Sequence, residues 1–271
     1  MNDEKFKKVI RKSFNVASIG YDRPAMRFFD QSAERLVKCV SLEGHENVLD
    51  VATGTGKVAL AAAARLKKGS VTGVDLSEGM LLVAKRKARY AGLTNASFLR
   101  SDVDALRLSR KNLDGLFCGF GVFFWSNMER SLSRLLETVK PDGFVAISSF
   151  AKGSFEPQSG LCLSRFHRYG VKLPKSYTWE RLGSIKQHKI LFQKVGLKNI
   201  RSHKKQMGYY LDGSESWWDL VRYTGFRSFL NKLSPSQAKR YKVEHMKEIK
   251  GTADKKGIWL NVEVIFTVAC R

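Results

Sequence analysis

Residues 48–56 read Val-Leu-Asp-Val-Ala-Thr-Gly-Thr-Gly, and an alanine-rich run follows over residues 57–66. The first four residues form a short, mostly apolar run, which is typical of a strand buried on both faces. Gly54 and Gly56 permit a sharp turn, and alanine strongly favours a helix. The stretch therefore predicts a strand, a tight turn and a helix with Gly69 as its C-cap.

The turn predicts a nucleotide-type ligand, because it leaves backbone N–H groups free at a helix start and lets a ligand approach the backbone. A phosphate loop of the NTPase type is excluded, since the residue after Gly56-Lys57 is neither Ser nor Thr. Gly54, Gly56 and Ala59 match the dinucleotide pattern G-x-G-x-x-A loosely. Asp50 disfavours a pyrophosphate at this edge and favours a cationic nucleoside such as S-adenosylmethionine (SAM).

Two further acids follow predicted strands. Asp75 ends the strand that begins at Val71, and Asp102 follows a third strand over residues 96–100. Because the carboxyl ends of parallel strands meet at one edge of a sheet, we expect Asp50, Asp75 and Asp102 to lie close together. A carboxylate at the end of the second strand is suited to accept hydrogen bonds from both ribose hydroxyls.

The run Asp-Val-Ala-Thr-Gly-Thr-Gly at residues 50–56 resembles the first motif of class I SAM-dependent methyltransferases. It is most similar to the ubiquinone/menaquinone-biosynthesis C-methyltransferase family, which also has alanine at the place of Ala52. The resemblance extends over residues 14–150. It implies a doubly wound α/β fold with a seven-stranded, mostly parallel sheet, SAM as cofactor and S-adenosylhomocysteine as product.

The resemblance also implies roles for single residues. Met80 would contact the adenine, and Asp102 would accept from its amino group while the next backbone N–H donates to the ring. Ser77 is expected as the N-cap of the helix that carries Met80. The expected cofactor-binding residues are Asp50, Ala52, Thr53, Gly54, Thr55, Gly56, Asp75, Leu76, Met80, Asp102, Val103, Gly119 and Phe120.

The acceptor side departs from the family pattern. Aromatic residues 123–125 follow Phe120-Gly121 where the family has polar residues. They predict either a stacking surface for a flat or apolar acceptor or packing against the helical insertion expected over residues 208–257. The candidate catalytic residues are Tyr21, in a segment that folds over the cofactor in such enzymes, and His167, after the fifth strand. Tyr169 is a further candidate there, and a plain structural role is the alternative for each.

The chain as a whole is expected to form one methyltransferase domain over residues 1–271. Within it we expect an N-terminal helical lid (1–45), a SAM-binding core (46–150) and a helical insertion (208–257) that caps the substrate before the last strand. Helical spacing predicts helices over 24–41, 127–139, 179–196 and 235–249, and strands are expected over 144–150, 199–209 and 259–269. Residues 139–143 are expected as a turn and 151–178 as irregular.

Composition limits the partners and the location. The net charge of +23 is uneven, with 24 basic and 16 acidic residues over 1–150 and 24 and 9 over 151–271. This excess of positive charge would favour binding to nucleic acid, to an anionic membrane surface or to acidic metabolites. Equally, the lysines can be solvated surface residues that bind no partner. The four cysteines are scattered, so neither a metal site nor a disulfide framework is expected. The sequence has no apolar run of about 18 residues, so we expect no membrane span. We also expect a cytoplasmic location.

The sequence thus predicts a SAM-dependent methyltransferase that acts on a small-molecule acceptor at oxygen or carbon. One alternative is an RNA or protein methyltransferase that uses the basic C-terminal half, and another is a SAM-binding module without catalysis. An NAD-dependent oxidoreductase is a third. The pattern of residues does not predict an oligomeric state.

Overall fold

Residues 3–108 and 112–271 are described by the computed structural model, in which the chain forms two compact units. The sheet unit consists of Phe29–Lys152, Thr178–Lys205 and Val264–Arg271, and the helical unit of Met1–Phe28, Gly153–Tyr177 and Gln206–Glu263. Residues 29–45 of the expected lid therefore fold with the sheet. Residues 1–2 of the expected lid and residues 109–111 of the expected SAM-binding core lie outside the described part of the chain. The roles of lid and cap stay predictions.

The sheet unit contains a seven-stranded sheet in the order β3-β2-β1-β4-β5-β9-β6. Its strands are β1 (Asn47–Val51), β2 (Ser70–Asp75), β3 (Ala96–Arg100), β4 (Leu113–Gly119), β5 (Val139–Phe150), β6 (Lys198–Gln206) and β9 (Glu263–Cys270). The pairs from β3 through β5 are parallel, and β9 runs antiparallel to β5. The predicted doubly wound, mostly parallel α/β fold is confirmed.

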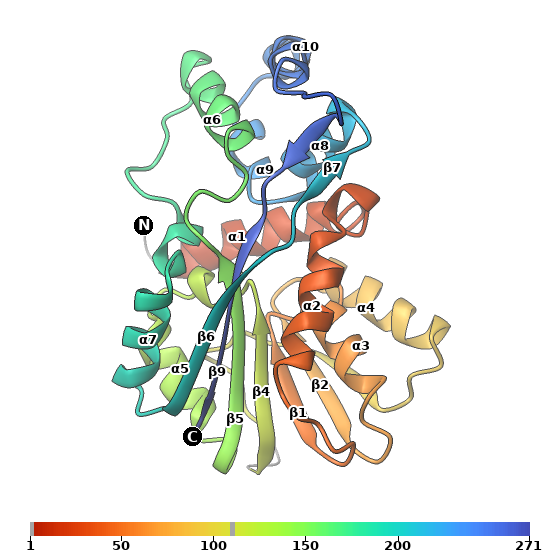
Figure 1. The fold of residues 1–271 in the computed structure, drawn as a ribbon, viewed down its shortest axis with the longest axis vertical. Helices are drawn as coiled ribbons and strands as arrows, with labels where there is room; N and C mark the ends of the chain where they lie inside the picture. The colour runs from red at the N-terminus through yellow and green to blue at the C-terminus, as the bar shows by residue number, and fades with distance from the viewer. Residues whose placement is uncertain (1–2, 109–111) are drawn as a thin grey trace. The chain divides into compact units, whose positions relative to one another are not determined.

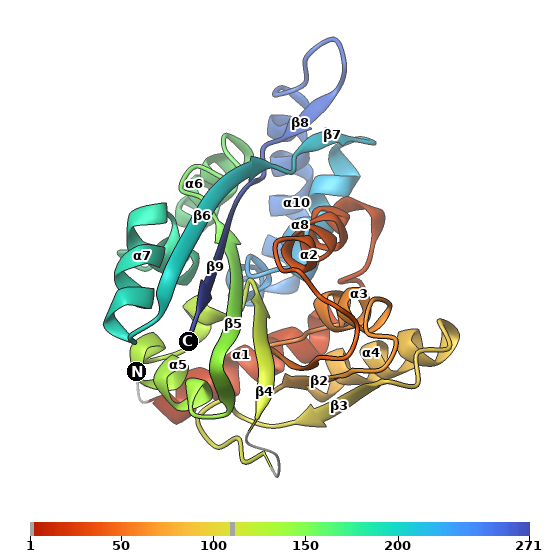
Figure 2. The same ribbon diagram turned by 60° about the horizontal axis from the view of Figure 1, so that its bottom comes forward.

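Helices cover both faces of this sheet. Figure 2 shows α2 (Phe28–Lys38), α3 (Lys57–Ala63) and α4 (Glu78–Tyr90) on one face, and α5 (Met128–Leu136) and α7 (Ile185–Lys194) on the other. Apolar side chains of β1, β4 and β5 form one core with Leu132, Leu135 and Leu191. Because both faces are buried, the central strands are nearly continuous apolar runs, and ligands can approach only at the strand ends.

Figure 1 shows the helical unit as a group of helices with one short pair of strands, and its core is rich in buried aromatic side chains. Tyr241 of α10 (Pro235–Lys250) stacks on Phe166 of α6 (Gln158–Arg168) with ring centroids 4.3 Å apart. Trp217 of α8 (Ser214–Tyr223) donates its Nε1–H to Nε2 of His245 at 2.8 Å. The unit also contains α1 (Asp3–Ala17), α9 (Arg227–Leu230) and a small antiparallel pair, β7 (Tyr209–Leu211) with β8 (Ile258–Leu260).

Several local predictions were wrong. The strand expected over 259–269 is divided between β8, which belongs to the two-stranded sheet, and β9, which belongs to the seven-stranded sheet. Residues 151–178 contain α6, whose first turn is stabilised by Glu156: its carboxylate accepts from Ser159 Oγ at 2.6 Å and from the Gly160 N–H at 3.2 Å. Residues 139–143 belong to β5, with a shift of register against β4. Gly69 does not cap α3, because that helix ends at Ala63, and the side chain of Asn95 donates to the Ala63 carbonyl at 3.0 Å and to the Leu66 carbonyl just beyond the helix at 2.7 Å.

In the part of the chain that the structure describes, no helix combines the length and apolar character needed to cross a bilayer.

Candidate functional site

The turn after β1 is held in an unusual backbone conformation. Ala52, Gly54 and Gly56 have φ angles of 55°, 55° and 82°, in the left-handed region that glycine adopts most easily. A Cβ on Gly56 would lie 2.9 Å from Cβ of Ala84 on α4, so this position has no room for a side chain. A Cβ on Gly54 would meet nothing within 4 Å. The turn is therefore packed tightly on its inner side and faces open space at Gly54.

Asp50 is fully buried at the end of β1, beneath this turn. Its Oδ2 accepts from the Thr53 hydroxyl at 2.5 Å and from the N–H of Ala59 at 3.0 Å, which fixes the turn to the first turn of α3. Within the described residues, its Oδ1 has no hydrogen-bond partner. Burial raises the pKa of Asp50 to about 7, and the charge of Asp75 adds to the shift. An unpaired buried oxygen of this kind favours a polar or cationic ligand group beside it.

Asp75 connects the turn to the next strand. Its Oδ2 accepts from the Gly54 N–H at 2.9 Å, and its Oδ1 accepts from the Ser77 N–H at 2.8 Å. Burial raises the pKa of Asp75, and these backbone donors oppose the shift. Ser77 also caps α4, because its hydroxyl accepts from the Met80 N–H as predicted. Each carboxylate oxygen has a second lone pair, so Asp75 can still accept from ligand hydroxyls.

The loop after β3 continues the same edge. The Ser101 N–H donates to the carbonyl of Asp75 at 3.1 Å. Asp102, the next residue in the chain, therefore lies beside the end of β2. The Asp102 carboxylate accepts from the Asp104 N–H at 3.0 Å. Asp104, which the sequence did not single out, accepts from the Ser131 hydroxyl at 2.5 Å and so ties the loop to α5. The three acids expected at one edge are brought there by the parallel strands.

The exit of β4 closes the other side of the turn. A Cβ on Gly121 would lie only 2.5 Å from Cβ of Ala52, so the two loops are in direct contact. Phe120 has a φ of 56°, which is rare for a residue with a side chain, and its N–H donates to the Ser148 carbonyl at 3.0 Å. Its ring stacks on Phe150 at 4.4 Å, with Phe29 edge-on at 5.2 Å.

The aromatic residues 123–125 do not together form an exposed stacking surface. The side chains of Phe123 and Trp125 are buried, and Trp125 belongs to the core beneath α5 and α7. Arg181 donates to the carbonyls of both residues, at 3.0 and 2.6 Å, and so fixes the loop from outside. Trp125 therefore packs in the core of the sheet unit, which is neither of the two placements expected for it. The partly exposed rings at this edge are those of Phe120, Phe124 and Phe150.

The two candidate catalytic residues belong to the helical unit. Tyr21 is half-buried and packs edge-on against Phe14, with ring centroids 6.2 Å apart. His167 lies exposed in the last turn of α6. Tyr169 packs against Tyr241, with ring centroids 5.6 Å apart. Their catalytic roles stay predictions.

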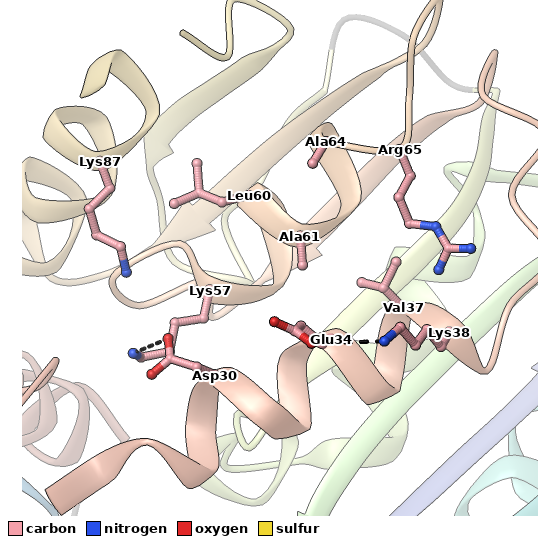
Figure 3. A pocket seen from close by; sticks show the side chains of 10 residues that line it. All are labelled: Asp30, Glu34, Val37, Lys38, Lys57, Leu60, Ala61, Ala64, Arg65 and Lys87. Atoms are coloured by element: carbon pink, nitrogen blue, oxygen red, sulfur yellow. Dashed lines mark hydrogen bonds and ion pairs between the residues drawn. The ribbon is translucent and has the colours of Figure 1, made fainter. Parts of the chain in front are cut away.

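A separate groove of about 350 Å³ lies between α2 and α3 in the sheet unit (Figure 3). Its floor is apolar and its rim carries charges, including the ion pair between Lys57 and Asp30 at 2.5 Å. It is lined by Asp30, Glu34, Val37, Lys38, Lys57, Leu60, Ala61, Ala64, Arg65 and Lys87. The α3 residues among them face away from the sheet, whereas the candidate cofactor residues lie at the strand ends.

Comparison with known proteins agrees with this geometry. The family model described as "Methyltransferase domain" matches residues 48–143, which span the turn and all three acids. The ubiquinone/menaquinone biosynthesis C-methyltransferase UbiE of Geotalea daltonii is 30% identical over 211 residues, which cover 71% of this chain and 85% of that protein. The chain belongs to the class I SAM-dependent methyltransferase family.

One further relative and one solved structure are also similar to this chain. Aklanonic acid methyltransferase DauC of Streptomyces sp. (strain C5) is 29% identical over 158 residues, or 57% of this chain and 72% of that protein. The crystal structure of YcgJ from Bacillus subtilis has a TM-score of 0.60 at 18% identity and covers 89% of this chain and 98% of that one. The second likeness shows the fold.

The residues at the strand edge fit SAM, the cofactor of this methyltransferase. The unpaired Oδ1 of Asp50 suits a cationic ligand, and the open space at Gly54 admits one close to the backbone. A cluster of three or more His, Cys, Asp or Glu side chains placed to hold a metal is absent from residues 3–108 and 112–271. The assignment of single residues to parts of SAM stays a prediction.

Sequence reasoning missed several residues that shape the site. Phe150 and Phe29 support the ring of Phe120, and Arg181 fixes the loop after it. Phe150 could have been suspected, because it ends the fifth strand at the same edge as Phe120. Nothing in the sequence around Arg181 pointed to carbonyl groups that lie far away in the chain.

Proposed function

We propose that this methyltransferase transfers the methyl group of SAM to a flat or apolar small molecule, at an oxygen or a carbon atom, by in-line displacement. The observation that carries the proposal is the stacked pair of Phe120 and Phe150 at the carboxyl ends of β4 and β5. Both rings are partly exposed, and the loop of Phe120 touches the cofactor turn through Gly121. A ring face at this place suits an aromatic or apolar acceptor.

The backbone of Phe120 supports a functional role for its ring. A non-glycine residue in the left-handed region costs on the order of 1–3 kcal/mol and persists where its surroundings hold it. Here the hydrogen bond to Ser148 and the contacts with Phe29 and Phe150 hold it. Such strained residues gather at ligand sites, which favours Phe120 as a residue that orients the acceptor.

The chemistry requires little from the protein beyond alignment. When bound, SAM supplies an activated methyl group together with a neutral leaving group. The protein has to hold the acceptor atom at roughly 3–3.5 Å from that methyl group and exclude water. In the proposal, Asp50, Asp75 and the turn at Gly54 hold the nucleoside. The aromatic face orients the acceptor.

A phenol or enol acceptor would benefit from a general base. Tyr21 and His167 are the candidates that the sequence offers. Tyr21→Phe and His167→Ala would each lower kcat and remove one limb of its pH profile if the residue is the base. An unchanged pH profile in both variants would assign the proton transfer to another group.

The rival proposal is an RNA or protein acceptor held by positive charge. The charge is not concentrated in one unit: the helical unit has 21 basic and 11 acidic residues, and the sheet unit has 27 and 14. A basic surface that holds a polymer would give a steep loss of affinity with salt. The names of the relatives, which refer to quinone biosynthesis and to aklanonic acid, support a small molecule instead.

The proposal is tested by release of S-adenosylhomocysteine with a panel of acceptors, from flat phenols and hydroquinones to polar amines and RNA. We expect turnover with the flat acceptors. Phe150→Leu should raise their KM by roughly two- to twelvefold and leave SAM affinity unchanged, because a lost aromatic contact is worth about 0.5–1.5 kcal/mol beyond its area. Phe144→Leu is the matched control, since Phe144 lies on the same strand and packs against Phe117. Turnover of RNA alone, or equal effects of both substitutions, would overturn the proposal.

A further inference from the structure

Helix α1 has one face packed against its own unit and one face in solvent. It packs against α8 and α9, and Ala17 at its end is buried. Lys5, Val9, Lys12 and Val16 recur at spacings of three and four residues, so they share the opposite, outward face. Residues Val9 and Val16 are 45% and 37% exposed there. The outward face therefore carries exposed lysines with two partly exposed valines beside them.

The turn after α1 extends this face. Gly20 packs directly on the ring of Tyr223, because a Cβ at Gly20 would lie 2.5 Å from three ring carbons. Arg23 adds an ion pair with Asp219 at 3.3 Å. These contacts anchor the turn on α8, and Ile19 in this turn is 81% exposed. The exposure of Ile19 is thus fixed by packing.

Positive charges flank the three apolar side chains. Lys5, Lys8 and Lys12 are all exposed, and no described residue forms an ion pair with them. The two acids of the helix, Asp3 and Glu4, lie in its first turn, and Asp3 pairs with Lys7. The rest of the outward face has no acid. A branched apolar stripe beside lysines is the pattern of a helix that lies in the interface of an anionic membrane.

We propose that the outer face of α1, defined by Lys5, Lys8, Val9, Lys12, Val16 and Ile19, docks this protein on the surface of an anionic bilayer. Ile19, Val9 and Val16 enter the headgroup region, and the three lysines remain at the lipid phosphates. Nucleic acid fits this face less well, because the three apolar residues are aliphatic and offer no ring for a base to stack on. The proposal does not depend on the identity of the methyl acceptor.

The test is co-sedimentation of the full chain with vesicles of phosphatidylcholine alone and of phosphatidylcholine mixed with phosphatidylglycerol. We expect binding to the mixed vesicles only, weakened by salt. The triple variant Lys5→Ser/Lys8→Ser/Lys12→Ser should bind roughly a hundredfold more weakly, at about fivefold for each lysine near an anionic surface. The variant Val9→Ser/Val16→Ser/Ile19→Ser should lose about tenfold or more.

Matched controls separate docking from the overall charge of +23. Lys85→Ser/Arg86→Ser/Arg89→Ser removes the same charge from α4, and Leu82→Ser/Tyr90→Ser/Val243→Ser removes apolar side chains that are 68%, 84% and 68% exposed. Both controls should bind vesicles within about twofold of the wild type, because they leave α1 intact. Circular dichroism and thermal melting show that each variant is folded.

Three results would overturn the proposal. The first is an equal loss of vesicle binding in the control variants, which would mean that net charge alone drives it. The second is unchanged vesicle binding in both α1 variants. The third is binding of the α1 face to a different partner. RNA as the partner would be seen as RNA binding that only the α1 variants lose, and a second copy of the chain as a dimer that only the α1 variants fail to form.

Discussion

The carboxylate of Asp75 accepts a hydrogen bond from the backbone N–H of Gly54 at 2.9 Å. One bond thus joins the end of β2 to the turn that follows β1. The other carboxylate oxygen accepts from the N–H of Ser77, at the start of α4. The residue proposed to bind the ribose therefore also holds two helix-start segments in place, and its replacement should affect both binding and stability.

Asp75→Ala should weaken SAM binding by about 1–3 kcal/mol, the cost of leaving charge-assisted hydrogen bonds unmade. Calorimetric titration measures this directly. Asp114→Ala is the matched control, because Asp114 accepts from the Asn47 N–H at 2.7 Å at the opposite ends of β1 and β4. Both variants should melt at lower temperature, and only Asp75→Ala should lose affinity. Equal SAM affinity in the two variants would refute the ribose assignment.

Gly54→Val should abolish SAM binding while the fold persists. A side chain at Gly54 projects into open space on the ligand side, and the left-handed φ of 55° adds strain. Gly92→Val is the control, because Gly92 has a φ of 65° and equally open surroundings but lies at the end of α4. The two variants should lose similar stability in urea. If Gly92→Val lost SAM binding as well, strain rather than obstruction would explain the effect.

Asp50 should make stability depend on pH in a defined direction. Its folded pKa is raised to about 7 by burial, whereas an unfolded aspartate titrates near 3.9. Between these two pKa values the folded state binds one more proton than the unfolded state. The contribution of Asp50 to the free energy of unfolding is therefore fully present below about pH 4 and is lost as pH rises through about 7. Asp50→Asn should remove this decline. Urea melts at both ends of the range measure it, and parallel pH profiles for the two proteins would contradict it.

SAM binding should release a proton near neutral pH. If the cationic part of SAM lies beside Asp50, it favours the ionised carboxylate, whose pKa is otherwise raised to about 7. Calorimetry in two buffers with different ionisation enthalpies gives the number of protons released. The release should vanish in Asp50→Asn. A release that persists in that variant would assign the proton to another group.

Buried His188 should make the sheet unit sensitive to acid. Its Nε2 lies 2.7 Å from Ser149 Oγ and its Nδ1 lies 2.8 Å from Thr267 Oγ1, and burial lowers its pKa to about 4. Because an unfolded histidine titrates near 6.5, the stabilising contribution is present above that pH and is lost as pH falls through about 4. His188→Gln should flatten this part of the stability profile. A wild-type slope in the variant would exclude His188 as its cause.

The cofactor edge could be predicted because its determinants are local. Gly54 and Gly56 are needed where the backbone turns left-handed, and the strand and helix on either side have clear patterns. Asp75 and Asp102 followed from one topological rule, that parallel strands end at the same edge. The capping role of Ser77 needed only its neighbours within one helical turn.

The acceptor side could not be predicted in the same way, because it depends on contacts between distant segments. Phe150 and Phe29 meet Phe120 only after the sheet and α2 have formed. The burial of Trp125 depends on α7, which follows it much later in the chain. Asn95 caps α3 from a loop beyond α4, a signal that no local rule for helix ends includes.

The most direct measurement is a crystal structure of the protein with S-adenosylhomocysteine. Our account predicts density for the nucleoside against the turn of residues 52–56, with the ribose hydroxyls on the carboxylate of Asp75 and the base near Asp102. Density for the nucleoside anywhere else, for example in the groove between α2 and α3, would contradict it.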